Sequence, residues 1–138
     1  MALPPPSPEP VRDKLAEAYL MAKNSRWATA AGLVQQALDQ GPRQDGPRVS
    51  AATEFLAECR YKAAFQTGSR EEFRDRMRKA KDDFERARTL HDESGSNGLA
   101  KKAESMALFS TFWLEDDQQN RGKILERCIS LATEAIHI

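Results

Sequence analysis

The sequence predicts an all-α fold of about six helices arranged in three antiparallel hairpins, and three observations support this prediction. Good helix formers such as Ala, Leu, Glu, Lys, Arg and Gln dominate the 138-residue chain after its first ten residues. Apolar residues recur at helical spacing in six segments, which short stretches containing Gly, Pro, Ser, Asn or Asp separate. In three of these segments the same packing pattern of small and large residues returns, as an internal repeat would require.

Five of the seven prolines fall within the first ten residues. Because proline fixes φ and lacks an N–H donor, residues 1–9 are expected to form a disordered tail. Residues 10–138 are then predicted to form a single helical-repeat domain. The chain stops on a helix without a cap or a polar tail, which is the pattern expected of a domain truncated from a longer protein.

The first pair of helices is predicted over residues 9–23 and 26–40. Asn24 and Ser25 break the chain between them, and Ser25 is a suitable N-cap for the second helix. Gly41 followed by Pro42 ends that helix. A connection of about two residues implies that the two helices are antiparallel.

The second pair is predicted over residues 51–66 and 70–90, after a linker at 41–48. Ser50 and Ser69 are expected to cap these helices, and Glu72 completes a capping box with Ser69. The second helix carries the clearest apolar stripe, with members at steps of four, three, four and three. These members are Phe73, Met77, Ala80, Phe84 and Ala87.

The third pair is predicted over residues 99–114 and 118–136, after a polar turn at 92–98. Its first helix is the most apolar element and is expected to lie deep in the fold. Phe109, Phe112 and Trp113 span a wide face of this helix. Such a face suits a helix covered on both sides, by its hairpin partner and by a following repeat or a second chain.

A triad of apolar residues spaced four and then three residues apart occurs once in each pair, and in the first two pairs it has a small–large–small pattern. A small residue lets a neighbouring helix approach closely, and the large one fills the groove beside it. The triads are Ala30–Val34–Ala37, Ala80–Phe84–Ala87 and Leu125–Ile129–Ala132, offset by 50 and 45 residues.

The segment from Ala18 to Pro42 resembles a tetratricopeptide repeat. Its residues at the motif's small, large, Leu and Pro positions are Ala18, Ala30, Val34, Ala37, Leu38 and Pro42, and Trp27 matches a position that is often aromatic. Residues 79–92 resemble the second half of this motif, with Asp92 in the place of Pro. The resemblance implies a superhelical array of hairpins that binds protein partners. The offsets exceed the 34 residues of the motif, so a closed helical bundle stays open as the alternative.

Composition disfavours several classes of function. Lys plus Arg and Asp plus Glu both number 21, so a whole-protein attraction to nucleic acid is not expected. Cys59 and Cys128 lie among apolar residues and are expected to be buried free thiols in a reducing, cytoplasmic environment. His91 and His137 are the only histidines and form no metal-binding or catalytic motif. The sequence therefore predicts no enzyme activity, no metal and no cofactor, and it contains no apolar run long enough to span a membrane.

The predicted function is a protein–protein interaction or scaffold module that binds a peptide or helix in a groove lined by the first helix of each pair. Self-association is the alternative, and a basic helix face that binds RNA or an anionic membrane is the third possibility. The expected groove contacts are Tyr19, Lys23, Arg60 and Lys62, and the basic face consists of Arg74, Arg78 and Lys81.

Overall fold

The computed structural model of the protein describes residues 9–40 and 46–136, and within them it contains six helices and no strand. The all-α prediction is therefore confirmed. The proline-rich segment 1–8, the linker residues 41–45 and His137 lie outside the described residues. The helices are α1 (Glu9–Lys23), α2 (Trp27–Gln40), α3 (Gly46–Ala64), α4 (Arg70–Glu93), α5 (Asn97–Leu114) and α6 (Gln118–Ile136).

The helix boundaries agree closely with the prediction except at three ends. α3 begins at Gly46 instead of Ala51, so the expected cap Ser50 is a buried residue inside the helix. Pro47 is compatible with this earlier start because the first turn of a helix needs no N–H from it. α4 extends to Glu93, and α5 begins at Asn97. The cap of α4 is confirmed, since the Ser69 hydroxyl accepts a hydrogen bond from the Glu72 N–H at 3.1 Å.

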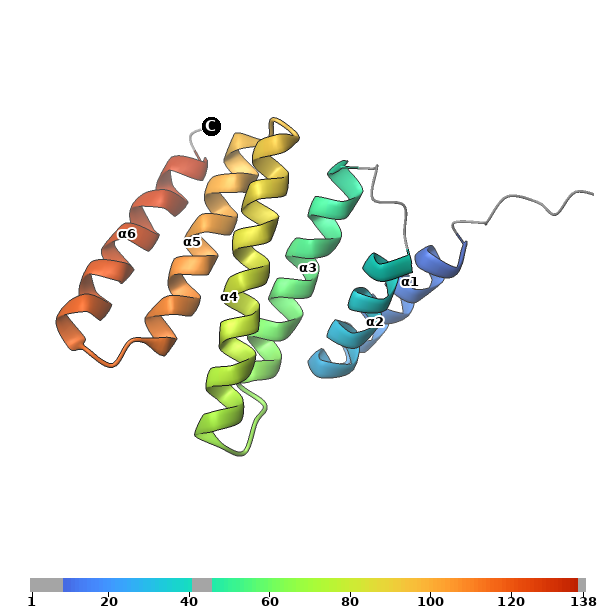
Figure 1. Cartoon of the computed structure of the whole chain (residues 1–138), viewed down its shortest axis with the longest axis horizontal. Helices are drawn as coiled ribbons and strands as arrows, with labels where there is room; N and C mark the ends of the chain where they lie inside the picture. The colour runs from blue at the N-terminus through green and yellow to red at the C-terminus, as the bar shows by residue number, and fades with distance from the viewer. Residues whose placement is uncertain (1–8, 41–45, 137–138) are drawn as a thin grey trace, which may run out of the picture.

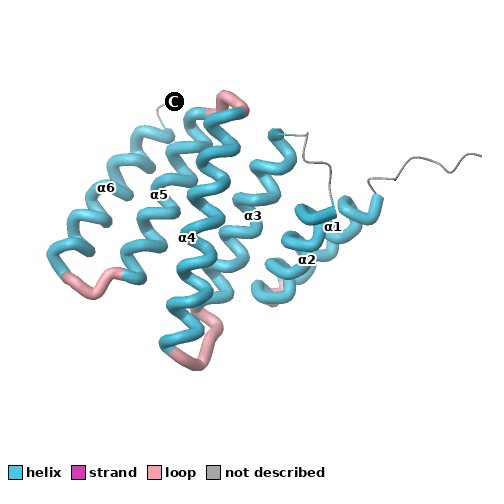
Figure 2. The backbone as a smooth tube through the Cα atoms, in the orientation of Figure 1, coloured by secondary structure: helices cyan, strands magenta, loops and turns pink. Residues whose placement is uncertain are grey.

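The helices form an open row in which the chain advances from α1 and α2 at one end to α6 at the other (Figure 1). Consecutive helices run in opposite directions, and from α3 to α6 the loops lie alternately at the lower and upper ends of the helices (Figure 2). Each helix packs most extensively against its neighbours in the chain. Because α1 and α6 lie at opposite ends, the fold is not a closed bundle.

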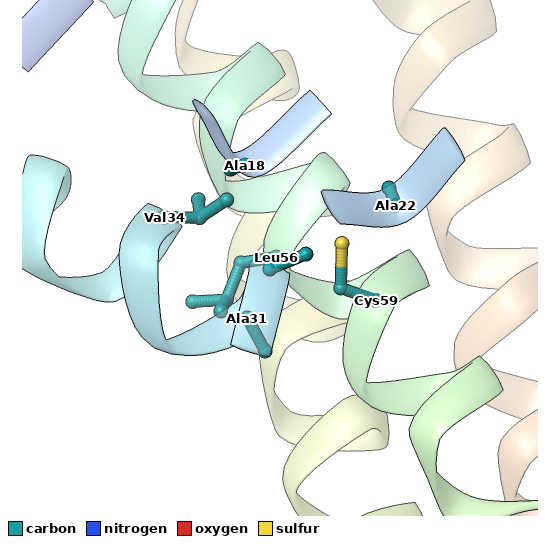
Figure 3. Close-up of a cluster of buried hydrophobic side chains, with 7 residues drawn as sticks. Ala18, Ala22, Ala31, Val34, Leu56 and Cys59 are labelled. Atoms are coloured by element: carbon teal, nitrogen blue, oxygen red, sulfur yellow. The ribbon is translucent and has the colours of Figure 1, made fainter. Parts of the chain in front are cut away.

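Small residues allow the helices to pack closely in two adjoining parts of the core. The first lies between α1, α2 and α3, where Val34 and Leu56 are surrounded by alanines and Cys59 (Figure 3). The second lies between α3, α4 and α5, where Phe84 is fully buried among Ala57, Ala80 and Ala107. The predicted triads of α2 and α4 are thus both buried in the core.

The triad predicted for α6 is wrong by one residue. Leu125, Ile129 and Ala132 are exposed, with Ile129 showing 60% of its surface. The side of α6 that packs against α5 instead carries Cys128, whose thiol lies 3.2 Å from the Ser105 hydroxyl, and Leu131. The error arises because α6 has apolar residues on two adjacent stripes, and only the position of α5 decides which one is covered.

None of the helices in the described part of the chain is long and apolar enough to cross a lipid bilayer.

Candidate partner-binding face

α3 carries a second stripe of side chains beside its core stripe, and one member, Phe55, also packs against the core cluster that contains Leu56 and Cys59. This stripe follows steps of four, three, four and three, so its members share one side of the helix and the turn that follows it. We call this surface the α3 face, and it consists of Ala51, Phe55, Glu58, Lys62 and Phe65. Ala51, Lys62 and Phe65 are exposed, and Phe55 and Glu58 are half-buried.

Aromatic rings from neighbouring helices hold the ends of the α3 face in place. Tyr19 of α1 stacks on Phe55, with ring centroids 4.3 Å apart and 27° between the planes. Near the other end, Phe65 meets Trp113 of α5 edge-on at 5.2 Å. The Trp113 indole N–H donates a hydrogen bond of 2.9 Å to the Tyr61 hydroxyl, which fixes α5 against α3. Stacked and edge-on ring contacts therefore support both ends of the α3 face.

The α3 face carries charges of both signs. The Lys62 ammonium lies 4.3 Å from the centroid of the Trp27 ring, a cation–π contact that orients the lysine. Burial raises the pKa of Glu58, and the nearby carboxylate of Glu54 raises it further. Lys102 of α5 and Lys62 oppose this shift. The surface is consequently amphipathic and has no strong excess of either sign.

Of the four groove contacts predicted from sequence, Tyr19 and Lys62 contribute to this region. Lys23 is exposed one helical turn beyond Tyr19. Arg60 lies elsewhere, because helical spacing puts it on the opposite side of α3 from Lys62. Its guanidinium donates to Asp83 of α4 at 2.5 Å and to Gln35 of α2 at 3.3 Å, so it ties three helices together instead of facing the predicted groove.

Carboxylates locally neutralise the predicted basic face on α4. Arg74 donates to the Leu114 carbonyl at 3.2 Å and lies 3.6 Å from Asp116, which anchors α4 to the end of α5. The other two cations pair along α4 itself, Arg78 with Asp75 at 3.7 Å and Lys81 with Glu85 at 3.7 Å. These three side chains therefore do not form a continuous positive surface.

Sequence reasoning missed several residues of the candidate site. Phe55 packs against the core cluster of Leu56 and Cys59 as well as lining this face, and Glu58, Lys102 and Trp113 were not expected to contribute. The second stripe of α3 was a detectable signal, because its spacing equals that of the core stripe. The contribution of α5 left no such signal, since it depends on how two helices separated in sequence pack.

The wide aromatic face of α5 is covered by helices of the same chain. Phe109 and Trp113 contact Tyr61 of α3, directly or through the hydrogen bond. The Arg121 guanidinium of α6 lies 4.3 Å from the centroid of the Phe112 ring. Helices α3 and α6 of the same chain thus cover α5 on two sides, so this face does not require a second chain.

Two further groups bear on possible chemistry. The imidazole of His91 is buried, and its Nε2 lies 3.7 Å from Glu54 Oε1 without a hydrogen-bond partner. Burial raises the pKa of Cys59 to about 12, so its thiol stays protonated at neutral pH and is a weak nucleophile. Neither group has the arrangement of an activated catalytic side chain.

A polar hollow of about 370 Å³ lies between α4, α5 and α6. Its charged lining consists of Arg88, Lys101 and Arg127 with Asp92, Glu104 and Glu134. Two ion pairs cross it, Lys101 with Glu134 at 2.6 Å and Arg88 with Glu104 at 3.7 Å. The charges of the cations and carboxylates that line the hollow thus balance each other. The lining therefore has no excess charge that would favour a charged ligand.

Comparison with protein-family models, curated proteins and solved structures gives no match for this chain. Over residues 9–40 and 46–136, no group of three or more His, Cys, Asp or Glu side chains is placed to hold a metal ion. The feature that carries the functional inference is the α3 face, a pre-organised aromatic surface with charges of both signs.

Proposed function

We propose that this protein is a non-enzymatic interaction module that binds a helix or peptide of a partner protein on the α3 face. The observation that carries the proposal is the exposure of Tyr19 and Phe65, which are 57% and 48% exposed although both are held by neighbouring rings. Ordered aromatic side chains lose little conformational freedom on binding and commonly act as interface anchors.

The chemistry of the α3 face favours an amphipathic partner helix. Ala51 to Phe65 spans about 21 Å at the rise of an α-helix, enough to contact roughly four turns of a partner. Between the aromatic ends lie Glu58 and Lys62, with Lys102 beside them. A partner with an apolar stripe bordered by charges of both signs would complement this pattern.

The proposal includes a tetratricopeptide-like arrangement of the helices. Two features support it: the small–large–small triads of α2 and α4 are buried, and the first helices of successive pairs contact one another. In such an array the first helices, here α1, α3 and α5, line the binding groove. The α3 face lies at the centre of that series.

Self-association is a second candidate function, and the exposed apolar stripe of α6 favours it. A basic surface for RNA or anionic membranes is not favoured, because each cation of the predicted α4 stripe lies within 4 Å of a carboxylate.

The experiment is selection of helical peptides from a displayed library against the whole protein, followed by affinity measurements on purified peptides. The double variant Tyr19→Ser/Phe65→Ser is expected to weaken the selected peptides at least about tenfold, because hot-spot aromatics carry most of the binding energy. The matched control is Leu20→Ser, which removes an apolar side chain of the same helix that is 55% exposed, as Tyr19 is 57% exposed, but is not one of the rings stacked on Phe55. If both variants lost affinity equally, or if the selected peptides bound both variants as tightly as the unaltered protein, the α3 face would be rejected as the site.

A further inference from the structure

Helix α6 has an apolar stripe that no other helix among residues 9–40 and 46–136 covers. Leu125, Ile129, Ala132 and Ile136 are spaced four, three and four residues apart, so they lie along one side of the helix. Ile129 is 60% exposed and Ile136 is 81% exposed, while Leu125 shows 37% of its surface. Figure 1 shows α6 as the last helix of the row.

On the earlier helices α2 and α4, the side that corresponds to the exposed stripe of α6 faces the following helix. Aligning the buried Cys128 of α6 with Val34 of α2 and Phe84 of α4 places Ile129 in the position of Gln35 and Glu85. On α2 this side faces the next helix, since Gln35 accepts a hydrogen bond from Arg60 of α3.

On α4 the same side also faces the next helix in the row. Arg88, one turn beyond Glu85, lies 3.7 Å from Glu104 of α5. The exposed stripe of α6 therefore occupies the position at which α2 and α4 receive a following helix.

We propose that the exposed stripe of α6 is a self-association surface and that its occupant is α6 of a second copy, packed antiparallel about a two-fold axis. The stripe is self-complementary in this orientation. When Ile129 lies opposite the small Ala132 of the second copy, Leu125 lies opposite Ile136 of that copy. At each level of the contact, a large residue therefore packs either against a small residue or against another large residue of the second copy. Such pairing resembles the seam of an antiparallel coiled coil. The same register sets Glu126 level with Ala135 of the second copy, so it brings no like charges together.

Helix α1, at the opposite end of the row, is a poorer partner for the exposed stripe of α6. The outer side of α1 exposes Leu20, but it also exposes the carboxylates Asp13 and Glu17. Packing α6 against α1 of another copy would bury these carboxylates against an apolar stripe, which is costly. A two-fold contact between identical α6 faces also closes the assembly at two copies, whereas a head-to-tail contact would continue indefinitely.

Sedimentation velocity of the full chain tests the proposal. Between about 1 and 500 µM, the range suited to a small interface, the mass is expected to rise toward that of two 15.5-kDa chains. Ile129→Glu and Ala132→Lys are each expected to weaken the dimer at least tenfold, because each sets a charge against an apolar residue of the second copy. Ser130→Glu, on the exposed side of α6 away from the stripe, is the control and should leave the dimer intact.

Mixing the two disruptive variants tests the register. In the mixed pair, the Glu at position 129 lies opposite the Lys at position 132, so association is expected to return. A protein that stays monomeric throughout the concentration range, or a dimer that survives Ile129→Glu, would overturn the proposal. Loss of the dimer without recovery in the mixture would overturn the antiparallel register. Because these residues lie away from the α3 face, Tyr19→Ser/Phe65→Ser should still dimerise, which separates this inference from the proposed peptide binding.

Discussion

At the scale of single residues, Asp83 shows how the fold accommodates a buried charge. Its side chain is 1% exposed, and each oxygen lies beside an arginine, Arg60 of α3 and Arg86 of α4. Because Arg60 also reaches Gln35 of α2, one carboxylate orders side chains from three helices. A buried carboxylate is tolerated only where such partners replace its water.

Asp83→Asn is therefore expected to lower the free energy of unfolding by about 2 kcal/mol, since it leaves two arginines without their counter-charge. The loss is smaller than for a fully buried pair because both guanidinium groups retain contact with solvent. Urea unfolding followed by circular dichroism measures it. The control is Asp82→Asn, which removes the exposed neighbouring carboxylate and should change stability by less than about 0.5 kcal/mol. Equal effects of the two substitutions would contradict this role of Asp83.

Glu58 provides a prediction for pH dependence. Burial and the neighbouring Glu54 raise the pKa of Glu58 above its ordinary value of 4.5, so ionisation of Glu58 disfavours the folded state. The protonated carboxyl of Glu58 contributes its full stability below the unfolded-state pKa. This contribution is lost as the pH rises through the folded-state pKa. Glu58→Gln should thus raise the melting temperature at pH 7, and this gain should disappear near pH 4.

Thermal melts across this pH range, compared with Glu126→Gln at an exposed position on α6, provide the measurement. A gain that persists unchanged at pH 4 would show that the carboxylate charge of Glu58 is not its cause.

At the scale of helices, the N-termini of α4 and α5 make a matched pair. Ser69 caps α4 through a side-chain hydrogen bond to Glu72, whereas Ser96, at the same position before α5, makes no such bond. Ser69→Ala should cost about 1 kcal/mol of unfolding free energy, and Ser96→Ala less than about 0.5 kcal/mol. Chemical denaturation of both variants measures the difference, and an equally large loss for Ser96→Ala would contradict the assignment.

Helix stripes explain both the successes and the errors of the sequence analysis. On α4 a single apolar stripe runs from Phe73 to Ala87, so its buried side was predicted correctly. On α3 and α6 two stripes with the same spacing lie next to each other, and periodicity cannot rank them. The α3 face and the exposed side of α6 were therefore misassigned or missed, because only the neighbouring helices determine which stripe is covered.

At the scale of the whole molecule, the open row predicts a gradient of stability. Each helix depends mainly on its chain neighbours, and the terminal helices have neighbours on one side only. Native-state hydrogen exchange should show the strongest protection in α3, α4 and α5 and weaker protection in α1 and α6. If α6 pairs with a second copy, its protection should increase with protein concentration while that of α1 does not. Uniform protection along the row would contradict this picture.

The sequence by itself determined the helices, their approximate ends and the small-residue triads of α2 and α4, because caps, breakers and periodicity act within a few residues of one another. The structure arranges these helices as an open row in which neighbours in the chain pack together. Only the tertiary structure decided that Arg60 turns inward to Asp83, that Trp113 braces Tyr61 and that Ile129 stays exposed. These outcomes depend on which helices approach one another, and helix packing joins residues that are separated by tens of positions in the chain.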